Sequence, residues 1–434
     1  MKNMIRQLLC LSILCVGCES TDTQGVDQAP SPWVGRHLET ATFGADDNSE
    51  VVKMTPDGTR AVLIASKARK ITLLSVTPTG LEVMRTTSLF TDDAGESELT
   101  HLDIDAAGTY AAITRTLPLK TGDKLTDCQG ELVFVNIADS EAFGTVIKTV
   151  AVGAMPDAVD LSPDGRWAVT ADEVDYNDGK CPLPEITASI TVIGLTDNDP
   201  RTANTRAVIR FPIMGEGARR EPEQIIFAPD SLRVAVTLQD THEVLLFNVD
   251  DVIGPDAAVR TVEGNGLNIT RLPDRSTGAE PWPDGVAAFE DATGQAYFAV
   301  AGEYNDTFTV LDREGAVVNH VELMESDFPS DLPRNIEDWS NAPFRPDSIA
   351  PFVFEGRRYL AFSLKHAGAV GVWTVDDVND IALASVIKIG NAEGGTPVTE
   401  STIGIEGISA GPNGLIVTAN EDESSASLVG PARP

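Results

Sequence analysis

Short apolar runs separated by turn residues recur along most of the chain. A typical unit starts with an acidic residue, continues through apolar positions to a Pro-Asp-Gly turn, and enters a second run rich in Ala, Val and Thr. Glu50-VVKMTPDG-TRAVLIAS and Asp157-AVDLSPDG-RWAVTADE are two such units. Apolar runs of this length bounded by Gly, Pro and Asp are typical of β-strands, so each unit predicts two strands joined by a tight turn.

The unit recurs seven times, at intervals of 50 to 66 residues, and we call its first residue the anchor. The anchors are Glu50, Thr100, Asp157, Glu223, Asp284, Asp347 and Glu406. A third strand-like run follows, as in Glu131-LVFVNI, and then a fourth, as in Gly144-TVIKTV. Four short antiparallel strands repeated seven times predict an all-β fold, a seven-bladed β-propeller.

Both ends of the repeat array bear on how the ring closes. The last repeat ends after its third strand, near residues 426–429, and the strand-like segment Gly35-RHLETATF precedes the first anchor. We therefore expect this N-terminal strand to complete the last blade and to cover an edge that would otherwise be open. The prediction is a single propeller domain over residues 33–430.

The repeats also carry a family resemblance. SPDGRWAVTADE and MTPDGTRAVLIAS resemble the YVTN-type propeller repeats of secreted and surface bacterial proteins. PDGVAAFEDATGQAYFAVAGEYND and EGISAGPNGLIVTANEDE resemble the choice-of-anchor class of extracellular propellers. The resemblance covers the whole folded part and implies the fold and an extracytoplasmic place, but no particular activity. The dipeptide of WD repeats is absent, so the signalling roles of that family are not implied.

The acidic anchors are the main candidate for a site. In a propeller the innermost strand of each blade lines the central channel, so residues at the start of these strands meet at one mouth. We predict a ring there of Glu50, Asp157, Glu223, Asp284, Asp347 and Glu406, with Thr100 interrupting it. Converging carboxylates repel each other, which raises their pKa values and costs stability.

Residues at the exits of the second strands are expected to lie beside this ring. They are Lys67, Arg115, Asp172, Asp240, Glu303, Lys365 and Glu421. Only three of these are cations, so about three of the six ring charges remain without a cation from this set. A divalent cation such as calcium, a basic peptide or an amine fits that surplus. The structural alternative is that the acids hold the preceding loops through backbone N–H groups and water; whether a metal binds is left open.

The N-terminus has the pattern of a targeting segment. Lys2 and Arg6 precede a short apolar run, and Cys15-Val16-Gly17-Cys18 resembles a bacterial lipobox. This predicts a lipoprotein signal peptide over residues 1–17, lipidation of Cys18 and a flexible tether over residues 18–32. An ordinary secretory signal cleaved nearby is the alternative. Glu19 after the cysteine favours the outer membrane or surface of a bacterial cell envelope, with the lipid as the only contact with the membrane.

The charge balance limits the partners. Lys and Arg number 32 against 66 Asp and Glu, a net charge of −34 that becomes −36 without Lys2 and Arg6. Such a charge argues against nucleic acid and anionic membranes and leaves proteins or cationic ligands as partners. Adaptation to high salt is an alternative explanation that requires no ligand.

Cysteine usage agrees with export. Cys18, Cys128 and Cys181 remain after processing, and Cys18 would carry the lipid. The other two fall in the long loops after the second strands of the second and third repeats, which adjacent blades bring together. We therefore predict a Cys128–Cys181 disulfide.

These patterns favour a binding or scaffolding module that acts through its acidic channel mouth. The alternative is a cation-dependent hydrolase, because propellers of this type resemble lactonases and phytase-like esterases with a metal at the central channel. The chain has no Gly-x-Ser-x-Gly elbow and no Cys-x-x-Cys-His haem motif. We assign no catalytic residue.

Overall fold

The computed structural model describes residues 33–44, 49–91, 97–121, 124–174, 181, 183, 186–212, 219–229, 233–255, 258–334, 342–389 and 403–432. The predicted signal peptide, the lipidated Cys18 and the tether lie outside the described residues. None of the helices in the described part has the length and hydrophobicity needed to cross a membrane.

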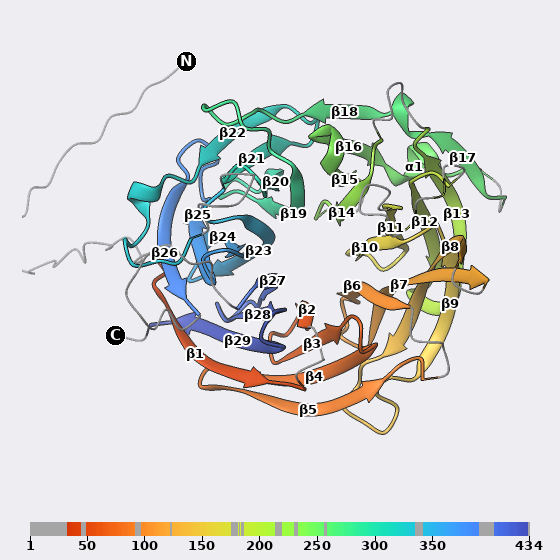
Figure 1. The fold of residues 1–434 in the computed structure, drawn as a ribbon, viewed down its shortest axis with the longest axis horizontal. Helices are drawn as coiled ribbons and strands as arrows, with labels where there is room; N and C mark the ends of the chain where they lie inside the picture. Colours follow the sequence, from red (N-terminus) through yellow and green to blue (C-terminus); the bar gives the residue numbers. More distant parts are fainter. Residues whose placement is uncertain are drawn as a thin grey trace, which may run out of the picture. The chain divides into compact units, whose positions relative to one another are not determined.

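Seven sheets stand side by side around one axis, which confirms the predicted seven-bladed propeller (Figure 1). The innermost strands, in blades 1 to 7, are β2 (Ser49–Met54), β6 (Glu98–Ile104), β10 (Pro156–Leu161), β14 (Pro222–Phe227), β19 (Pro283–Glu290), β23 (Pro346–Phe354) and β27 (Ile405–Ala410). The second strands are β3 (Arg60–Ala65), β7 (Tyr110–Thr121), β11 (Trp167–Asp172), β15 (Arg233–Leu238), β20 (Ala296–Gly302), β24 (Arg357–Leu364) and β28 (Ile416–Asn420).

The outer half of each blade follows in the same order. The third strands are β4 (Lys70–Thr77), β8 (Lys124–Asn136), β12 (Ser189–Thr196), β16 (Glu243–Asn248), β21 (Thr307–Asp312), β25 (Ala369–Thr374) and β29 (Ser425–Pro431). The fourth strands are β5 (Gly80–Ser88), β9 (Val146–Val152), β13 (Asp199–Arg210), β18 (Asn268–Arg271), β22 (Val317–Glu322), β26 (Ala382–Lys388) and, in blade 7, β1 (Gly35–Thr42).

The N-terminal strand closes the ring as expected. Strand β1 pairs antiparallel with β29, from Gly35 opposite Pro431 to Thr42 opposite Ser425. Trp33, just before β1, is buried, and its backbone N–H donates to the hydroxyl of Tyr359 in blade 6 at 3.0 Å. The N-terminal and C-terminal strands of the propeller are therefore joined within one sheet, and Trp33 also contacts the neighbouring blade 6.

The departure from four strands per blade occurs between blades 3 and 4. The chain leaves β16 through the short helix α1 (Val249–Val252), adds β17 (Arg260–Glu263) parallel to β13 of blade 3, and only then returns to blade 4 as β18. The repeat pattern did not predict this exchange, because β17 has no apolar run of its own.

The hydrophobic core consists of seven clusters in the described part of the chain, one at each interface between adjacent blades. Strand β3 shows how one strand serves two interfaces. Ala61 and Leu63 belong to the cluster shared with blade 7, whereas Val62 and Ile64 belong to the cluster shared with blade 2. Because successive side chains point to opposite faces and both faces are covered, these strands read as continuous apolar runs.

The tight turns between first and second strands need a left-handed backbone. Gly58, Gly108, Gly165 and Gly414 have φ between 66° and 72°, a conformation that glycine adopts without steric cost. Asp57 and Asp164 accept hydrogen bonds from backbone N–H groups two residues further on. The Pro-Asp-Gly pattern thus fixes the turns of blades 1 and 3 locally.

The predicted Cys128–Cys181 disulfide is present and joins residues 53 apart in sequence. Cys181 lies between β11 and β12, but Cys128 lies inside β8, opposite Pro118 of β7, rather than in a loop. The reason is that β7 and β8 extend into a long hairpin where most blades have a four-residue turn. A cross-link of this span contributes about 2–4 kcal/mol by restricting the unfolded chain.

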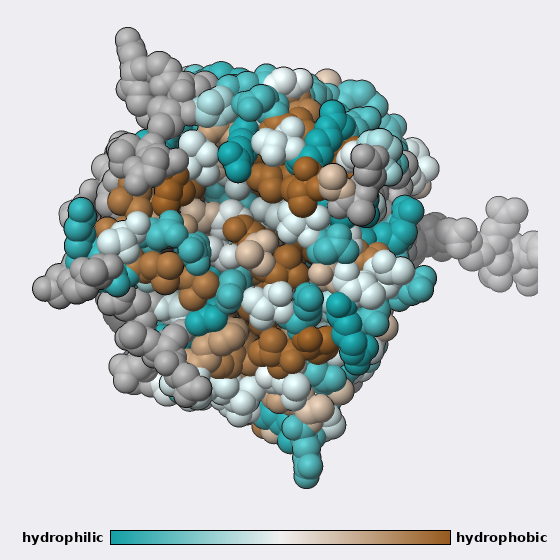
Figure 2. Space-filling model, turned by 90° about the vertical axis from the view of Figure 1, so that its right-hand side faces the viewer, coloured by the Kyte–Doolittle hydropathy of each residue, from teal (hydrophilic) through white to brown (hydrophobic). Residues whose placement is uncertain are grey.

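The outer side of the ring, seen at the right of Figure 1 and facing the viewer in Figure 2, has apolar groups in several small patches divided by hydrophilic residues. Exposed large apolar side chains such as Val146 and Val259 are single residues of different strands and loops. Scattered exposure of this kind is ordinary for a protein surface. The central channel, in contrast, gathers chemically similar side chains.

Candidate functional site: the acidic mouth of the central channel

Each inner strand breaks register with its neighbour at the anchor. In β2 the pairing passes from Ser49–Ala65 to Val51–Ile64, so Glu50 is an extra residue without a partner in the ladder. The same shift occurs at the other six anchors. A β-bulge bends a strand and redirects the side chain at that point. Seven bulges at equivalent places therefore set the anchors at one level of the ring.

The anchors surround one cavity of about 510 Å³ at the centre of the propeller. Its lining includes all six acidic anchors, Glu50, Asp157, Glu223, Asp284, Asp347 and Glu406, together with Thr100 and the rim residue Glu421. The structure thus brings together every residue of the predicted ring. Their role as a binding site stays a prediction.

Cations lie on one side of this ring. Lys365 forms an ion pair with Glu406. Arg345 contacts Glu303 at 2.5 Å between Nη2 and Oε1, and its guanidinium carbon lies 4.5 Å from the centre of the Tyr304 ring. Lys365 pairs with Glu406 and opposes the rise that burial causes in the pKa of Asp347, and Lys67 opposes the same rise in the pKa of Glu50, so we call Asp347, Glu406 and Glu50 the lysine arc.

The opposite side is more acidic, and we call Asp157, Glu223 and Asp284 the acid arc. The four charged groups that act most strongly on Glu223 are Glu173, Asp157, Asp284 and Glu303, all of them acids. Burial, followed by repulsion from these acids, raises the pKa of Glu223 well above its ordinary value. Burial and then Asp347 and Glu303 raise that of Asp284 in the same direction.

Glu50 of the lysine arc and the neighbouring rim residue Glu303 also have shifted pKa values. Burial raises the pKa of Glu50 to about 7, with smaller contributions from Glu421 and Glu98, against a hydrogen bond from Ser66. Burial raises the pKa of Glu303 to about 7 although Arg345 opposes it. Burial at the mouth therefore favours the protonated form of Glu50, Glu223, Asp284 and Glu303 more than water does.

The rim residues have several different environments. Lys67 is exposed, Asp240 is half-buried in a 3-10 turn and Glu421 lies near Glu50. Arg115 is buried, pairs with Glu131 at 2.9 Å and lies over the Phe90 ring, so its charge is used outside the ring. Asp172 is fully buried and accepts hydrogen bonds from the hydroxyls of three neighbours, Thr170, Ser189 and Thr191.

When the turns after the second strands are aligned by their hydrogen bonds, three of the seven rim positions predicted from sequence spacing, Asp172, Asp240 and Lys67, are displaced by one residue. The backbone N–H of Glu303, Lys365 and Glu421 donates to a carbonyl two residues before the anchor of the same blade. Glu173 and Gln239 make the same hydrogen bond in blades 3 and 4, one residue after Asp172 and one before Asp240. In blade 1 the equivalent is Ser66, three residues before the left-handed Arg69, rather than Lys67. Sequence spacing alone did not fix this alignment because the turns carry no common motif.

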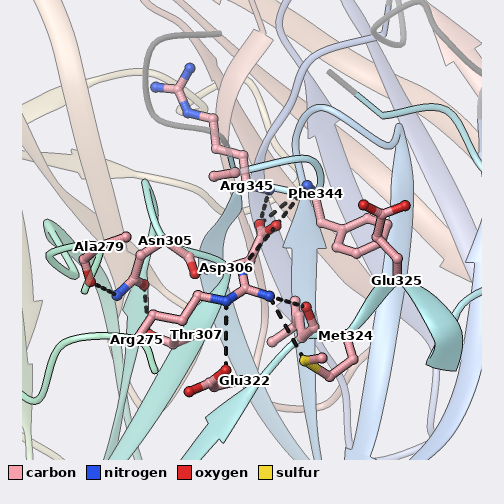
Figure 3. Close-up of polar contacts among 12 residues, drawn as sticks. Arg275, Ala279, Asn305, Asp306, Thr307, Glu322, Met324, Glu325, Phe344 and Arg345 are labelled. Carbon is pink, nitrogen blue, oxygen red and sulfur yellow. Dashed lines mark hydrogen bonds and ion pairs between the residues drawn. The ribbon is translucent and has the colours of Figure 1, made fainter. Parts of the chain in front are cut away.

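Asp306, in the turn between β20 and β21 of blade 5, fixes the backbone of the segment that carries Arg345 (Figure 3). The carboxylate of Asp306 accepts hydrogen bonds from the backbone N–H groups of Phe344, at 3.2 Å, and Arg345, at 2.8 Å. Arg275 lies 3.8 Å from the same carboxylate, and the Arg345 side chain points away from it (Figure 3). Burial raises the pKa of Asp306 to about 7.

A second polar layer, which the sequence did not predict as a site, lies three residues further along the inner strands of blades 1 to 3. Lys53 contacts Asp103 at 2.9 Å. Asp103 accepts a hydrogen bond from the N–H of Leu161, and Asp160 one from the N–H of Phe227, in each case from the next blade. The signal was present, because the polar residues stand three positions after anchors in otherwise apolar strands.

The same inter-blade bond recurs where Ser409 accepts from the N–H of Met54 across the closure from blade 7 to blade 1. His101, in the same channel wall, contacts the N–H of Val159 at 3.3 Å through Nδ1, and burial lowers its pKa to about 4. The layer therefore ties adjacent blades together, and Lys53, His101 and Asp160 line the same cavity as the anchors.

One group of acids at the mouth has the spacing of a metal site. Oxygen atoms of Asp284, Glu303 and Asp347 all lie within 4.8 Å of one another. Carboxylate oxygens are the ligands that calcium prefers, and calcium takes six to eight of them. Glu303, however, is already bound by Arg345, so this group offers fewer free oxygens than its spacing indicates.

Comparison with known proteins agrees with the fold. Residues 50–251 match the Choice-of-anchor I domain. This match covers a little less than half of the chain and agrees with the resemblance seen in its repeats. No curated protein matches the sequence.

Solved propellers match most of the chain at low identity. Hydrazine synthase from Kuenenia stuttgartiensis has a TM-score of 0.57 and 12% identity, covering 90% of this chain and 97% of that one. A streptogramin B lyase has a TM-score of 0.55 and 11% identity, covering 91% and 97%. Virginiamycin B lyase from Staphylococcus aureus has a TM-score of 0.53 and 12% identity, covering 91% and 99%. These likenesses show the fold alone.

Proposed function

We propose that this protein is a binding module, anchored in the bacterial cell envelope, that recognises a positively charged group at the mouth of its central channel. One observation carries the proposal: six acidic anchors surround one cavity, and Lys365 pairs with Glu406, one of the six. A cavity of about 510 Å³ is within the usual size range of ligand pockets.

The proposed location rests on the sequence. The charged start, the apolar run and the lipobox-like Cys15-Val16-Gly17-Cys18 support a lipid anchor on Cys18. The match to a Choice-of-anchor domain and a disulfide between Cys128 and Cys181 support a place outside the cytoplasm. The strongly negative charge favours a basic protein or an amine over nucleic acid as the partner.

A cation-dependent hydrolase is the second candidate. The spacing of Asp284, Glu303 and Asp347 favours it, since these carboxylates are close enough to share one divalent ion. In such an enzyme the ion would polarise a carbonyl or phosphoryl oxygen. The ion pair between Arg345 and Glu303 speaks against it, because a guanidinium beside the ion weakens its binding.

Thermal unfolding separates the two functions. We would measure the melting temperature with decalysine peptide, with millimolar calcium chloride and with a chelator, at low ionic strength. A ligand at about one hundred times its Kd adds about 3 kcal/mol, which raises the melting temperature by several degrees.

The binding module predicts a shift with the peptide that salt reduces and that the double variant Asp157→Asn, Asp284→Asn abolishes. Glu290→Gln, an exposed acid at the other end of β19, is the matched control and should keep the shift. A shift with calcium alone, lost in Asp284→Asn with Asp347→Asn, would support the hydrolase instead. No shift with any cation would contradict the proposed binding function.

A further inference from the structure

The central carboxylate of the acid arc, Glu223, has an oxygen atom that receives no hydrogen bond from the described residues. The Oε2 atom of Glu223 is buried in the channel wall and has no hydrogen-bond partner among the described residues. A buried carboxylate oxygen that lacks a donor is costly, since it has given up water without replacing it. Glu223 therefore offers an acceptor that an N–H group of a ligand can satisfy.

The spacing around Glu223 favours an organic cation over a metal ion. In the described part of the chain, Asp284, Glu303 and Asp347 form the only group of three or more candidate ligands within 4.8 Å of one another. Glu223 and Asp157 are not in that group, so the acid arc is wider than the coordination shell of one ion. An ammonium or guanidinium is larger and donates hydrogen bonds to acceptors spread around it.

The wall next to these acids is apolar. Ile226 stands three residues after Glu223 on β14, and Ala288 four residues after Asp284 on β19. Both line the cavity, are partly exposed and pack against the hydrophobic cluster between blades 4 and 5. On blade 3 the residue equivalent to Ile226 is Asp160, which is buried and accepts a hydrogen bond from the Phe227 N–H. The apolar wall beside the acid arc therefore lies on blades 4 and 5.

We infer that the channel binds an amine or guanidinium on a hydrocarbon stem, with the charged head at Glu223 between Asp157 and Asp284 and the stem against Ile226 and Ala288. A lysine or arginine side chain of a partner protein has this chemistry, as does a free alkylamine. The inference rests on the proposed function and deepens it by naming the ligand class and the position of its head.

Calorimetric titration tests this with n-hexylammonium chloride, methylammonium chloride, n-hexanol and calcium chloride, at pH 8 and low ionic strength. We expect n-hexylammonium to bind at least tenfold tighter than either methylammonium or hexanol, because only it fills both parts of the site. Glu223→Gln should weaken n-hexylammonium at least tenfold, and Glu290→Gln should leave it unchanged. Ile226→Ser should remove most of the advantage of n-hexylammonium over methylammonium.

The outcomes are distinct. Unchanged n-hexylammonium binding in Glu223→Gln, with loss in Asp284→Asn plus Asp347→Asn, would overturn this inference and leave the proposed function standing. Equal affinity for methylammonium and n-hexylammonium would overturn the role of the apolar wall. Competition by calcium at equal concentration would place a metal ion at the head position instead. Should Glu223→Gln fold poorly by circular dichroism, Glu223→Asp must still weaken n-hexylammonium, or the inference fails.

Discussion

The lysine arc and the acid arc occupy equivalent places in the repeat, yet their electrostatics differ. In both, a bulge at the start of the inner strand directs a carboxylate to the channel mouth. Glu406 of the lysine arc has Lys365 as its ion-pair partner, whereas the strongest charged neighbours of Glu223 in the acid arc are all acids. The difference arises from the turn after the second strand, where blade 6 has Lys365 and blades 3 and 5 have Glu173 and Glu303. The repeat thus builds the ring, and single turn residues decide which part of it is neutralised.

The largest expected effect comes from removing Arg345, the ion-pair partner of Glu303. In Arg345→Met, Glu303 remains with only 4% of its side chain exposed and no guanidinium beside it. Breaking such a pair by deleting one partner costs about 3–5 kcal/mol. Urea unfolding at pH 8 measures this loss, with the exposed pair of Arg201 as control: Arg201→Met should change stability by less than about 1 kcal/mol. Equal stability of Arg345→Met and the parent would show that the mouth does not depend on this pair.

The next effect is a loss of stability as the pH rises from 6.5 to 8. Glu50, Glu303 and Asp306, each with a pKa of about 7, hold protons in the folded state that the unfolded chain has released, and burial raises the pKa values of Glu223 and Asp284 in the same direction. Stability falls wherever the folded state binds more protons, so this contribution, present at lower pH, disappears as the pH passes the folded values.

We expect the free energy of unfolding to fall by about 3 kcal/mol over that range. Urea unfolding at several pH values measures this change. The pH range of 6.5 to 8 is chosen to avoid the titration of His101. Burial lowers the pKa of His101, and this lowered pKa destabilises the fold only when the pH falls below the ordinary pKa of histidine. Adding n-hexylammonium should flatten the dependence. Stability that rises with pH over this range would contradict the raised pKa values.

The smallest effect compares the two arcs directly. Glu223→Gln at pH 8 should stabilise the fold by about 1–2 kcal/mol, because it removes a buried charge surrounded by acids. Glu406→Gln should destabilise it by about 1 kcal/mol, because Lys365 loses its ion-pair partner in a partly buried place. Both are measured by urea unfolding. Changes of the same sign would mean that the arcs do not differ as described.

Much of the fold could be predicted because its signals are local. Alternation, turn residues and the repeat spacing each depend on a few neighbouring positions, and the Gly35-RHLETATF strand was predicted because it had the pattern of a fourth strand with no blade of its own. Convergence of the anchors followed from closure of the ring. The exchange of β17 to blade 3 was not predicted, since a four-residue exposed strand carries no periodic signal.

The tertiary structure determines which charged side chains pair with each other. Arg115 pairs with Glu131 rather than with the ring, Asp172 accepts from three hydroxyls rather than facing the channel, and Arg345 contacts Glu303. These pairings depend on turns whose alignment shifts by one residue between blades. A shift of one residue turns a side chain to the other face of a strand. The sequence by itself therefore determined the ring of blades and the ring of acids, because repetition specifies both. Only the packed structure decided which acids are neutralised, since Coulomb interactions depend on distances between segments far apart in the chain.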